Sequence, residues 1–197
     1  MQTPPTLTAG PVSLRPHTRA DRDDIVEACR DEQTWTWTTV PHPYEPEHAD
    51  AYLDRTIGTD IDSEWPRWAI EVAEGVGAAG PPATGRGRFS GNFGLTLDGA
   101  GLANVGYFVA PWARGRGVGT LALWLACDWA FREGDCQVVT WEALVGNGES
   151  RRMVEKVGFR VHGDVRRLGV VQRGTRVDVW TGDLLPEDLV PLETLLP

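Results

Sequence analysis

The segment from Val105 to Thr120 constrains the fold of this chain most, because a glycine-rich turn in it joins an apolar strand to a helix. Glycines at 115, 117 and 119 allow backbone conformations that other residues rarely adopt. Successive N–H groups of such a turn can converge on an anion, and the following helix adds the positive end of its dipole. Arg114 and Arg116 can close over the same phosphates. The segment predicts a site for a phosphorylated cofactor, although such a turn can also be a tight connection alone.

The order of strand-like and helix-like segments predicts an α/β fold with about seven strands and about four helices. Strands are expected at 12–15, 67–74, 88–97, 102–110, 137–143, 159–171 and 176–184. Helices are expected around 25–29, at 46–57, after the glycine turn from 118, and at 149–157. Residues 33–46 are expected to be irregular, and residues 75–87 to form a flexible loop. Pro111, which has no N–H to donate, either opens the sheet or simply ends its strand.

The length of 197 residues predicts one domain over 11–190, between a loosely ordered lead at 1–10 and a tail at 191–197. The net charge of −9 argues against general nucleic-acid binding and weakly favours cationic or amine-bearing partners. The three cysteines lie far apart without metal-ligand spacing, so we expect no metal site and free thiols in a reducing cytoplasm. No stretch reads as a signal peptide or a membrane span.

Several motifs in order resemble the GNAT superfamily of acyl-CoA-dependent N-acyltransferases. Arg114–Gly119 is similar to the family's Gln/Arg-x-x-Gly-x-Gly/Ala pyrophosphate loop. Four further motifs are similar to the branch that contains ribosomal-protein N-terminal acetyltransferases: Asn147-x-x-Ser150, Glu155-Lys-x-Gly158-Phe159, Val105-Gly-Tyr107 and Leu185-Pro-Glu-Asp188. The resemblance covers about residues 12–190 and agrees with the expected element order.

The resemblance implies a mixed, splayed sheet and acetyl-CoA as co-substrate. The CoA pyrophosphate would lie on the N–H groups from Arg116 to Thr120, and the pantetheine arm would pair with the strand around Phe108–Ala110. An amine on a small molecule or a protein N-terminus would attack the thioester directly. Homodimers are common in this branch, so the resemblance also implies a possible homodimer. The implied cofactor-binding residues are Phe108, Val109, Arg114, Gly115, Arg116, Gly117, Val118, Gly119, Thr120, Asn147 and Ser150.

The reaction needs an N–H donor for the tetrahedral oxyanion and a proton for the leaving thiolate. We choose the Val109 amide for the first role. Many family members protonate the thiolate with a tyrosine whose position here is Val154, so the usual acid is absent. In this branch Ser150 is the replacement candidate, although Ser150 could also merely cap its helix, and Asn147 could be only a turn residue.

The sequence leaves open which group takes the proton of the amine. Glu142 lies on the strand that would line the site, and Glu32, His42 and Tyr44 lie near or in the segment that covers the acceptor in this branch. A water-relayed proton or an acceptor that arrives neutral is equally possible. Expected acceptor-lining residues are Trp35, Trp37, His42 and Tyr44.

Three other functions compete with acetyl transfer. The same fold could use another acyl-CoA such as succinyl-CoA, paired with Arg86, Arg88 or Arg151. A non-catalytic acyl-CoA-binding module would explain the missing tyrosine. A dinucleotide oxidoreductase would use Gly115-x-Gly117 with Asp135, but Thr120 replaces the third glycine of that fingerprint.

Overall fold

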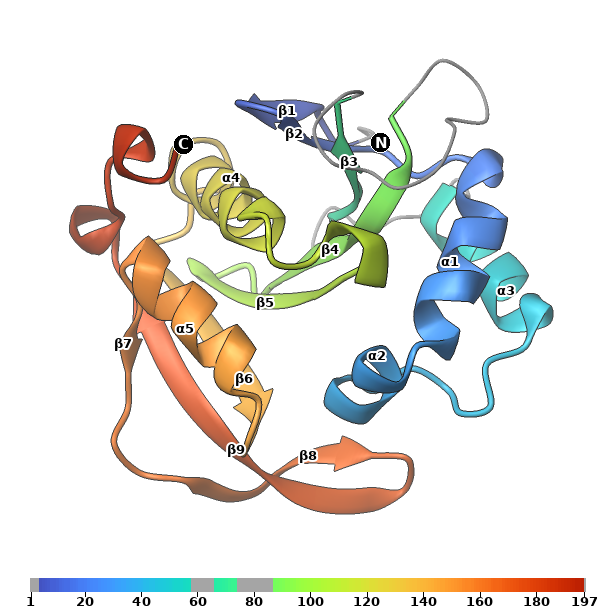
Figure 1. Cartoon of the computed structure of the whole chain (residues 1–197). Helices are drawn as coiled ribbons and strands as arrows, with labels where there is room; N and C mark the ends of the chain where they lie inside the picture. The colour runs from blue at the N-terminus through green and yellow to red at the C-terminus, as the bar shows by residue number, and fades with distance from the viewer. Residues whose placement is uncertain (1–3, 58–65, 74–86, 197) are drawn as a thin grey trace.

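The structure is a computed structural model that describes residues 4–57, 66–73 and 87–196 (Figure 1). Within these ranges the strands are β1 (Leu7–Ala9), β2 (Val12–Arg15), β3 (Arg67–Val72), β4 (Phe89–Leu97), β5 (Leu102–Val109), β6 (Val138–Leu144), β7 (Arg160–Val161), β8 (Arg166–Gln172) and β9 (Thr175–Leu184). The helices are α1 (Arg22–Arg30), α2 (Glu32–Trp37), α3 (Pro46–Ile57), α4 (Val118–Arg132) and α5 (Gly148–Val157). Residues 75–86 of the loop expected at 75–87, which include Arg86, and the expected end of β3 at Glu74 lie outside the described residues.

All nine described strands belong to one mixed sheet, which confirms the predicted α/β class. The strand order is β1-β2-β3-β4-β5-β6-β9-β7, and β8 pairs with β9. Neighbours are antiparallel except β5 and β6, which run parallel. A parallel pair needs a crossover connection, and α4 supplies it.

The sheet opens where β5 and β6 diverge. Their register runs from Leu102↔Val138 to Val105↔Trp141 and stops there. Both strands nevertheless continue, β5 to Val109 and β6 to Leu144. The opening therefore begins four residues before the end of β5, earlier than Pro111, where the sequence indicated it.

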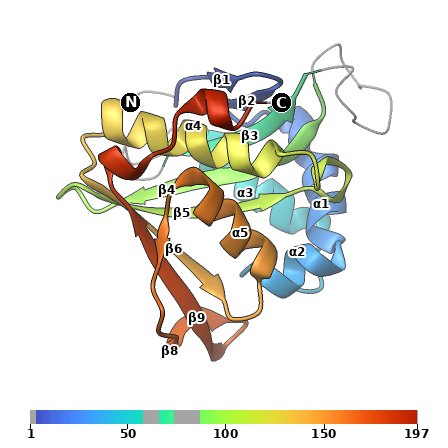
Figure 2. The same ribbon diagram turned by 60° about the vertical axis from the view of Figure 1, so that its left-hand side comes forward.

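Helices cover both faces of the sheet. The apolar core on one face contains α4 residues such as Leu121 and Leu125, packed against Trp68 and Trp141. A second core, on the other face, joins α1 and α3 through Ile25 and Leu53. Figure 2 shows α5 beside α4, lying over β6 and β9, while the β8–β9 hairpin extends away at the other end. The opening between β5 and β6 thus lies between two helical layers.

Three local expectations were wrong. Residues 32–37 form α2 rather than an irregular segment, because the Asp31 side chain accepts a hydrogen bond from the Thr34 N–H and caps the helix. Part of the expected loose lead, Leu7–Ala9, is strand β1, which pairs with β2. The expected strand at 159–171 is broken into β7 and β8, and Leu168 within β8 has a left-handed φ of 54°.

The structure describes all three cysteines of the chain. Cys29, Cys127 and Cys136 are free and buried, as the sequence indicated for Cys29 and Cys127. Burial raises the pKa of the Cys29 thiol to about 12, so this thiol is held in its neutral form. Across the part of the chain that is described, no helix is both long and apolar enough to cross a membrane.

Candidate active site

A cavity of about 810 Å³ lies at the opening between β5 and β6. Its walls come from the end of β5, the glycine turn, the start of α4, β6, the first turns of α5, and α2. It brings together all of the predicted cofactor-binding residues except Arg116, which is exposed on the turn. Residues that lie up to about 40 positions apart along the chain thus share one cavity.

The glycine turn has the backbone conformation that requires glycine. Gly115 and Gly117 have φ values of 73° and 74°, in the left-handed region, and a Cβ on either would meet no protein atom within 4 Å. The requirement is therefore conformational, and the space beside the turn is open to a ligand. Gly119 differs, because a Cβ there would lie 2.7 Å from the Met153 sulfur and 3.0 Å from Val109 Cγ2. Gly119 lets the first turn of α4 pack closely against β5 and α5.

The backbone of Val109 faces the opening. The N–H of the next residue, Ala110, donates to the Ser90 carbonyl near the start of β4. Because backbone groups of successive strand residues point to opposite edges, those of Val109 point to the edge that β6 has left. The Val109 carbonyl there accepts a hydrogen bond of 3.0 Å from Arg114 Nε. The Val109 N–H, our predicted oxyanion donor, lies on the same edge.

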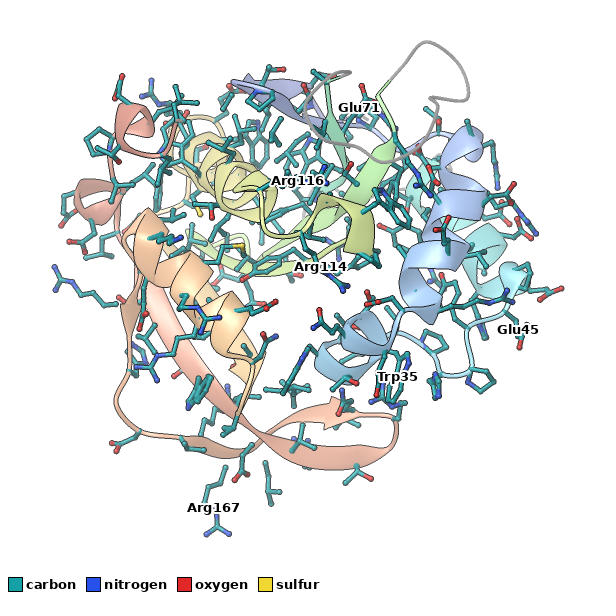
Figure 3. All side chains as sticks on the ribbon, in the orientation of Figure 1. Trp35, Glu45, Glu71, Arg114, Arg116 and Arg167 are labelled. Carbon is teal, nitrogen blue, oxygen red and sulfur yellow. The ribbon has the colours of Figure 1, made fainter. Side chains whose placement is uncertain are left out.

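Arg114 connects the glycine turn to α2 in this structure. Its guanidinium forms an ion pair of 2.7 Å with Asp31 and donates hydrogen bonds of 2.9 and 2.8 Å to the side chains of Gln33 and Thr34. Figure 3 shows Arg114 directed towards α2. Burial acts to raise the pKa of Asp31, but the hydrogen bonds from Arg114 and Thr34 outweigh it and lower that pKa. Arg114 thereby fixes the distance between the two walls of the cavity.

Ser150 stands at the centre of a hydrogen-bond network. Its Oγ lies 2.9 Å from the Tyr107 hydroxyl and accepts a hydrogen bond of 3.0 Å from Trp141 Nε1. The Ser150 N–H donates to the Asn147 side chain, so Asn147 caps α5. Trp141 can only donate, and if Tyr107 also donates, Ser150 keeps its own proton for a group in the cavity. Val154, at the position of the usual tyrosine, is fully buried.

Tyr107 is a site residue that the sequence reasoning did not assign. It appeared only within the Val105-Gly-Tyr107 motif, which was quoted for the resemblance. Burial raises the pKa of Tyr107 far above its usual range, and this outweighs the opposing hydrogen bonds of Ser150 and Trp141. Tyr107 therefore stays protonated and acts on Ser150 as a neutral hydrogen-bonding partner.

The structure places only some of the candidate bases and acceptor-lining residues at the cavity. Glu142 lines the cavity, but its carboxylate forms an ion pair with Arg166. Trp37 also lines the cavity, whereas Trp35 stacks on His42 with ring centroids 4.2 Å apart. Trp35 and His42 line neither described cavity, and Figure 3 shows Trp35 on the outer side of α2.

The tip of the β8–β9 hairpin holds α2 in place through backbone carbonyls. Gln172 Nε2 donates hydrogen bonds of 2.9 Å to the carbonyls of Thr36 and Thr38, and Arg173 donates one of 2.8 Å to that of Trp35. Two segments far apart in sequence thus meet beside the cavity. Farther along β8, Arg167 points away from the molecule (Figure 3).

A second cavity, of about 260 Å³, continues from the first on the α1–α3 side of the sheet. Tyr44 lines it, together with Tyr52 of α3 and the sheet residues Arg67, Asn92 and Thr96. The residues that line both cavities are Thr38, Thr39, Asn104, Gly106, Tyr107 and Phe108. The sequence did not indicate these polar residues of the sheet, because Arg67 comes from β3 and Asn92 and Thr96 from β4. Among the described residues, no three His, Cys, Asp or Glu side chains are grouped as a metal site requires.

Comparisons with known proteins identify the family domain and the fold. A family model described as an acetyltransferase (GNAT) domain matches residues 12–160. Mycobacterium smegmatis RimJ in complex with CoA-disulfide has 19% identity and a TM-score of 0.76, over 94% of this chain and 87% of that chain. A GCN5-related N-acetyltransferase from Brucella melitensis has 23% identity and a TM-score of 0.75, over 100% and 88%. Spermidine N-acetyltransferase from Vibrio cholerae with CoA and spermine has 18% identity and a TM-score of 0.70, over 90% and 97%. No curated protein sequence matches the chain.

Proposed function

Because the chain belongs to the acetyltransferase (GNAT) family, we propose that it transfers the acetyl group of acetyl-CoA directly to a primary amine. The opening of the sheet carries this proposal. A glycine turn, the edge of β5 at Val109 that no other strand pairs with, and the Ser150 hydroxyl converge on one cavity there. These are the groups that a phosphorylated carrier, a tetrahedral oxyanion and a leaving thiolate require.

The cofactor half of the reaction follows from the residues around the opening. The N–H groups at the start of α4 would hold the pyrophosphate, and the free edge of β5 would pair with the pantetheine arm. The thioester carbonyl would then lie beside the Val109 N–H, which would stabilise the oxyanion that forms as the amine attacks. Ser150, held by Tyr107 and Trp141, would protonate the departing thiolate.

The acceptor half follows from the second cavity. It meets the first at Gly106–Phe108, so an amine that enters from the α1–α3 side can reach the thioester without displacing the cofactor. This arrangement supports a ternary complex and no acyl-enzyme. The acceptor is either a protein N-terminal α-amine or a small-molecule amine; one relative, a spermidine N-acetyltransferase, is described with CoA and spermine.

A two-stage experiment tests the proposal. In a thermal-shift titration with acetyl-CoA, succinyl-CoA, free CoA and NADH, we expect acetyl-CoA to stabilise the protein. A ligand at about 100 times its Kd adds about 2.7 kcal/mol, which is enough to detect. Release of free thiol from acetyl-CoA is then measured with a panel of polyamines and of peptides with free N-termini.

The possible outcomes separate the competing functions. Turnover with an amine from the panel supports acetyl transfer. A shift with succinyl-CoA alone would point to a different acyl group, and a shift with NADH alone would overturn the cofactor assignment. Binding of acetyl-CoA without turnover of any amine would favour a non-catalytic binding module.

A further inference from the structure

One face of β3, β4 and β5 forms the floor of the second cavity. Residues that alternate along these strands share that face, because side chains of a strand point to its two faces in turn. Arg67 of β3 pairs with Gly94 of β4, which in turn pairs with Gly106 of β5. All three line the cavity. They form a row across the sheet that ends at Gly106, where the two cavities meet.

The two glycines of this row leave space for different groups. A Cβ on Gly94 would lie 2.6 Å from Arg67 Nη1 and 2.7 Å from Arg67 Cδ, so Gly94 makes room for the arginine side chain to lie across β4. A Cβ on Gly106 would meet no atom within 4 Å. Neither glycine has a left-handed φ. Among the described residues, neither backbone conformation nor packing requires glycine at 106, and its lack of a side chain keeps the space above β5 open.

Arg67 gives the cavity a positive charge. Its Nη1 donates hydrogen bonds of 2.8 Å to the Leu95 carbonyl and 3.3 Å to the Pro66 carbonyl, which hold the guanidinium over the sheet. Of the described residues that line the cavity, Arg67 is the only charged one. Burial lowers the pKa of Arg67, yet a guanidinium stays protonated at physiological pH. A partly desolvated positive charge attracts an anion and repels a further cation.

Neighbouring side chains add hydrogen-bond donors to this charge. Asn92 Oδ1 accepts a hydrogen bond from the Tyr52 hydroxyl and lies 2.9 Å from His17 Nε2. The oxygen of the Asn92 amide is thereby engaged, whereas no hydrogen bond among the described residues engages its NH2 group, which is left to donate to a ligand. The Thr96 hydroxyl lines the same cavity. Donors beside a guanidinium are the groups that a carboxylate requires.

The dimensions of the cavity limit the acceptor to a small molecule. Its volume of about 260 Å³ lies below the range of roughly 300–1,000 Å³ that is usual for drug-sized ligands. The Arg67 side chain lies over β4, and β5 follows at the usual strand spacing of about 4.8 Å. An amine above Gly106 and an anionic group at Arg67 can therefore be only a few bonds apart.

We propose that the acceptor is a small amine that carries a carboxylate, as an amino acid does, and that Arg67 binds this carboxylate with help from Asn92. This inference rests on the proposed function. The amine lies above Gly106, beside the thioester, and the bond changes are those of the proposed acetyl transfer, because the carboxylate only positions the amine. Polyamines are poor acceptors, since their further ammonium groups would face Arg67.

The first test compares acceptors with the wild-type full chain and acetyl-CoA. The panel contains the standard α-amino acids, their primary amides, spermidine, and peptides that begin with aspartate or glutamate. We expect kcat/KM for the best amino acid, measured by mass spectrometry of the acetylated product, to exceed that of its amide at least tenfold. The amine of the amide is the weaker base and is neutral more often, so a larger neutral fraction cannot explain a preference for the acid.

The second test uses variants of the Arg67 site. Arg67→Gln should raise the KM of the best amino acid by about a hundredfold, while the KM of its amide and the Kd for acetyl-CoA stay within threefold of the wild-type values. Gly94→Ala keeps the charge but displaces the guanidinium, and should raise the KM of the acid alone by about tenfold. Arg167→Gln makes the same substitution at an arginine that points away from the molecule, and should behave as wild type (Figure 3).

The outcomes separate this inference from the function on which it rests. Equal increases in KM for acid and amide in Arg67→Gln would overturn it, as would a wild-type preference for spermidine or for the amides. If Arg67→Gln folds poorly, Gly94→Ala decides by the same comparison. Acetylation of the acidic peptides but of no free amino acid would overturn the assignment to a small molecule. Binding of acetyl-CoA without acetylation of any amine would instead count against the proposed function.

Discussion

The two sides of the candidate active site would recognise their proposed ligands by different means. On the cofactor side the ligand would meet backbone groups, from the glycine turn and from the free edge of β5 at Val109. On the acceptor side it would meet side chains of the sheet and of α3, such as Asn92, Thr96 and Tyr52. Backbone groups are the same in any sequence that keeps the local conformation. The cofactor side therefore depends on a few glycines, whereas each side chain of the acceptor wall can alter specificity.

The most damaging change on the cofactor side is expected at Gly117. Gly117→Val would place a branched side chain at φ 74°, in the space where a phosphate would approach the N–H groups. We expect affinity for acetyl-CoA to fall by about a thousandfold, equivalent to about 4 kcal/mol, measured by calorimetry. Gly99→Val is a matched control, because Gly99 has φ 71° and an equally open surrounding at a hairpin distant from the site. If both variants bind alike, the turn does not hold the cofactor.

Ser150→Ala is expected to affect the chemical step and not binding. Loss of the hydroxyl removes the proton donor for the thiolate, so kcat should fall by about two orders of magnitude. Steady-state kinetics with a separate measurement of the Kd for acetyl-CoA distinguishes an effect on kcat from an effect on binding. An unchanged kcat in Ser150→Ala would leave Ser150 with a structural role alone.

Tyr107→Phe keeps Ser150 but removes its neutral hydrogen-bonding partner 2.9 Å away, and should lower kcat by less than Ser150→Ala does, in the same kinetic measurement.

Asp21→Asn tests how much the ion pair between Asp21 and Arg15 contributes to the free energy of unfolding. Burial acts to raise the pKa of Asp21, but hydrogen bonds from Arg15 and from the Thr18 N–H outweigh it and hold that pKa well below its usual range. The carboxylate thus stabilises the folded state above about pH 4, and this contribution is lost as pH falls further. We expect urea unfolding to show a loss of about 3 kcal/mol at pH 7, and a smaller one at pH 3. A loss that does not change with pH would show that the charge is not its source.

The smallest effect is expected at Arg114, which bridges the two sides. Lysine keeps the charge but cannot reproduce the fork that reaches Asp31, Gln33 and Thr34 together. If Arg114 chiefly positions α2, Arg114→Lys should raise the KM of the acceptor by roughly tenfold, about 1.4 kcal/mol, and leave the Kd for acetyl-CoA nearly unchanged. The opposite pattern would assign Arg114 to the phosphates, as its place in the motif first indicated.

Local sequence patterns point to the residues of the proposed cofactor side, and the reasons for this are physical. The conformation of the glycine turn is set within a few residues, and Asn147 and Ser150 fall in one capped helix start. Their neighbours in space follow from the strand–turn–helix order. The predicted α/β class was confirmed for the same reason.

The acceptor side depends on contacts that no local pattern contains. Tyr52 reads as an inward residue of α3, and Asn92 as one polar residue within a β-strand. Their connection through His17 appears only when α3 packs on the sheet. The helix at 32–37 was missed because its cap and its anchor at Arg114 lie outside the periodic pattern. Tyr52 and Asn92 lie 35 and 75 positions from His17 along the chain, so tertiary packing brings these three side chains together.

The hydrogen bonds from the β8–β9 hairpin to α2 and the residue after it affect which side chains of this segment can change during evolution. Gln172 and Arg173 hold carbonyl oxygens, which are present whatever amino acid stands at positions 35, 36 and 38. Mutation can therefore exchange the side chains at these three positions while the segment keeps its hydrogen bonds to the hairpin. Of these positions, Thr38 lines both cavities, so its side chain could change acceptor preference during evolution while the main chain keeps its hydrogen bond to the hairpin.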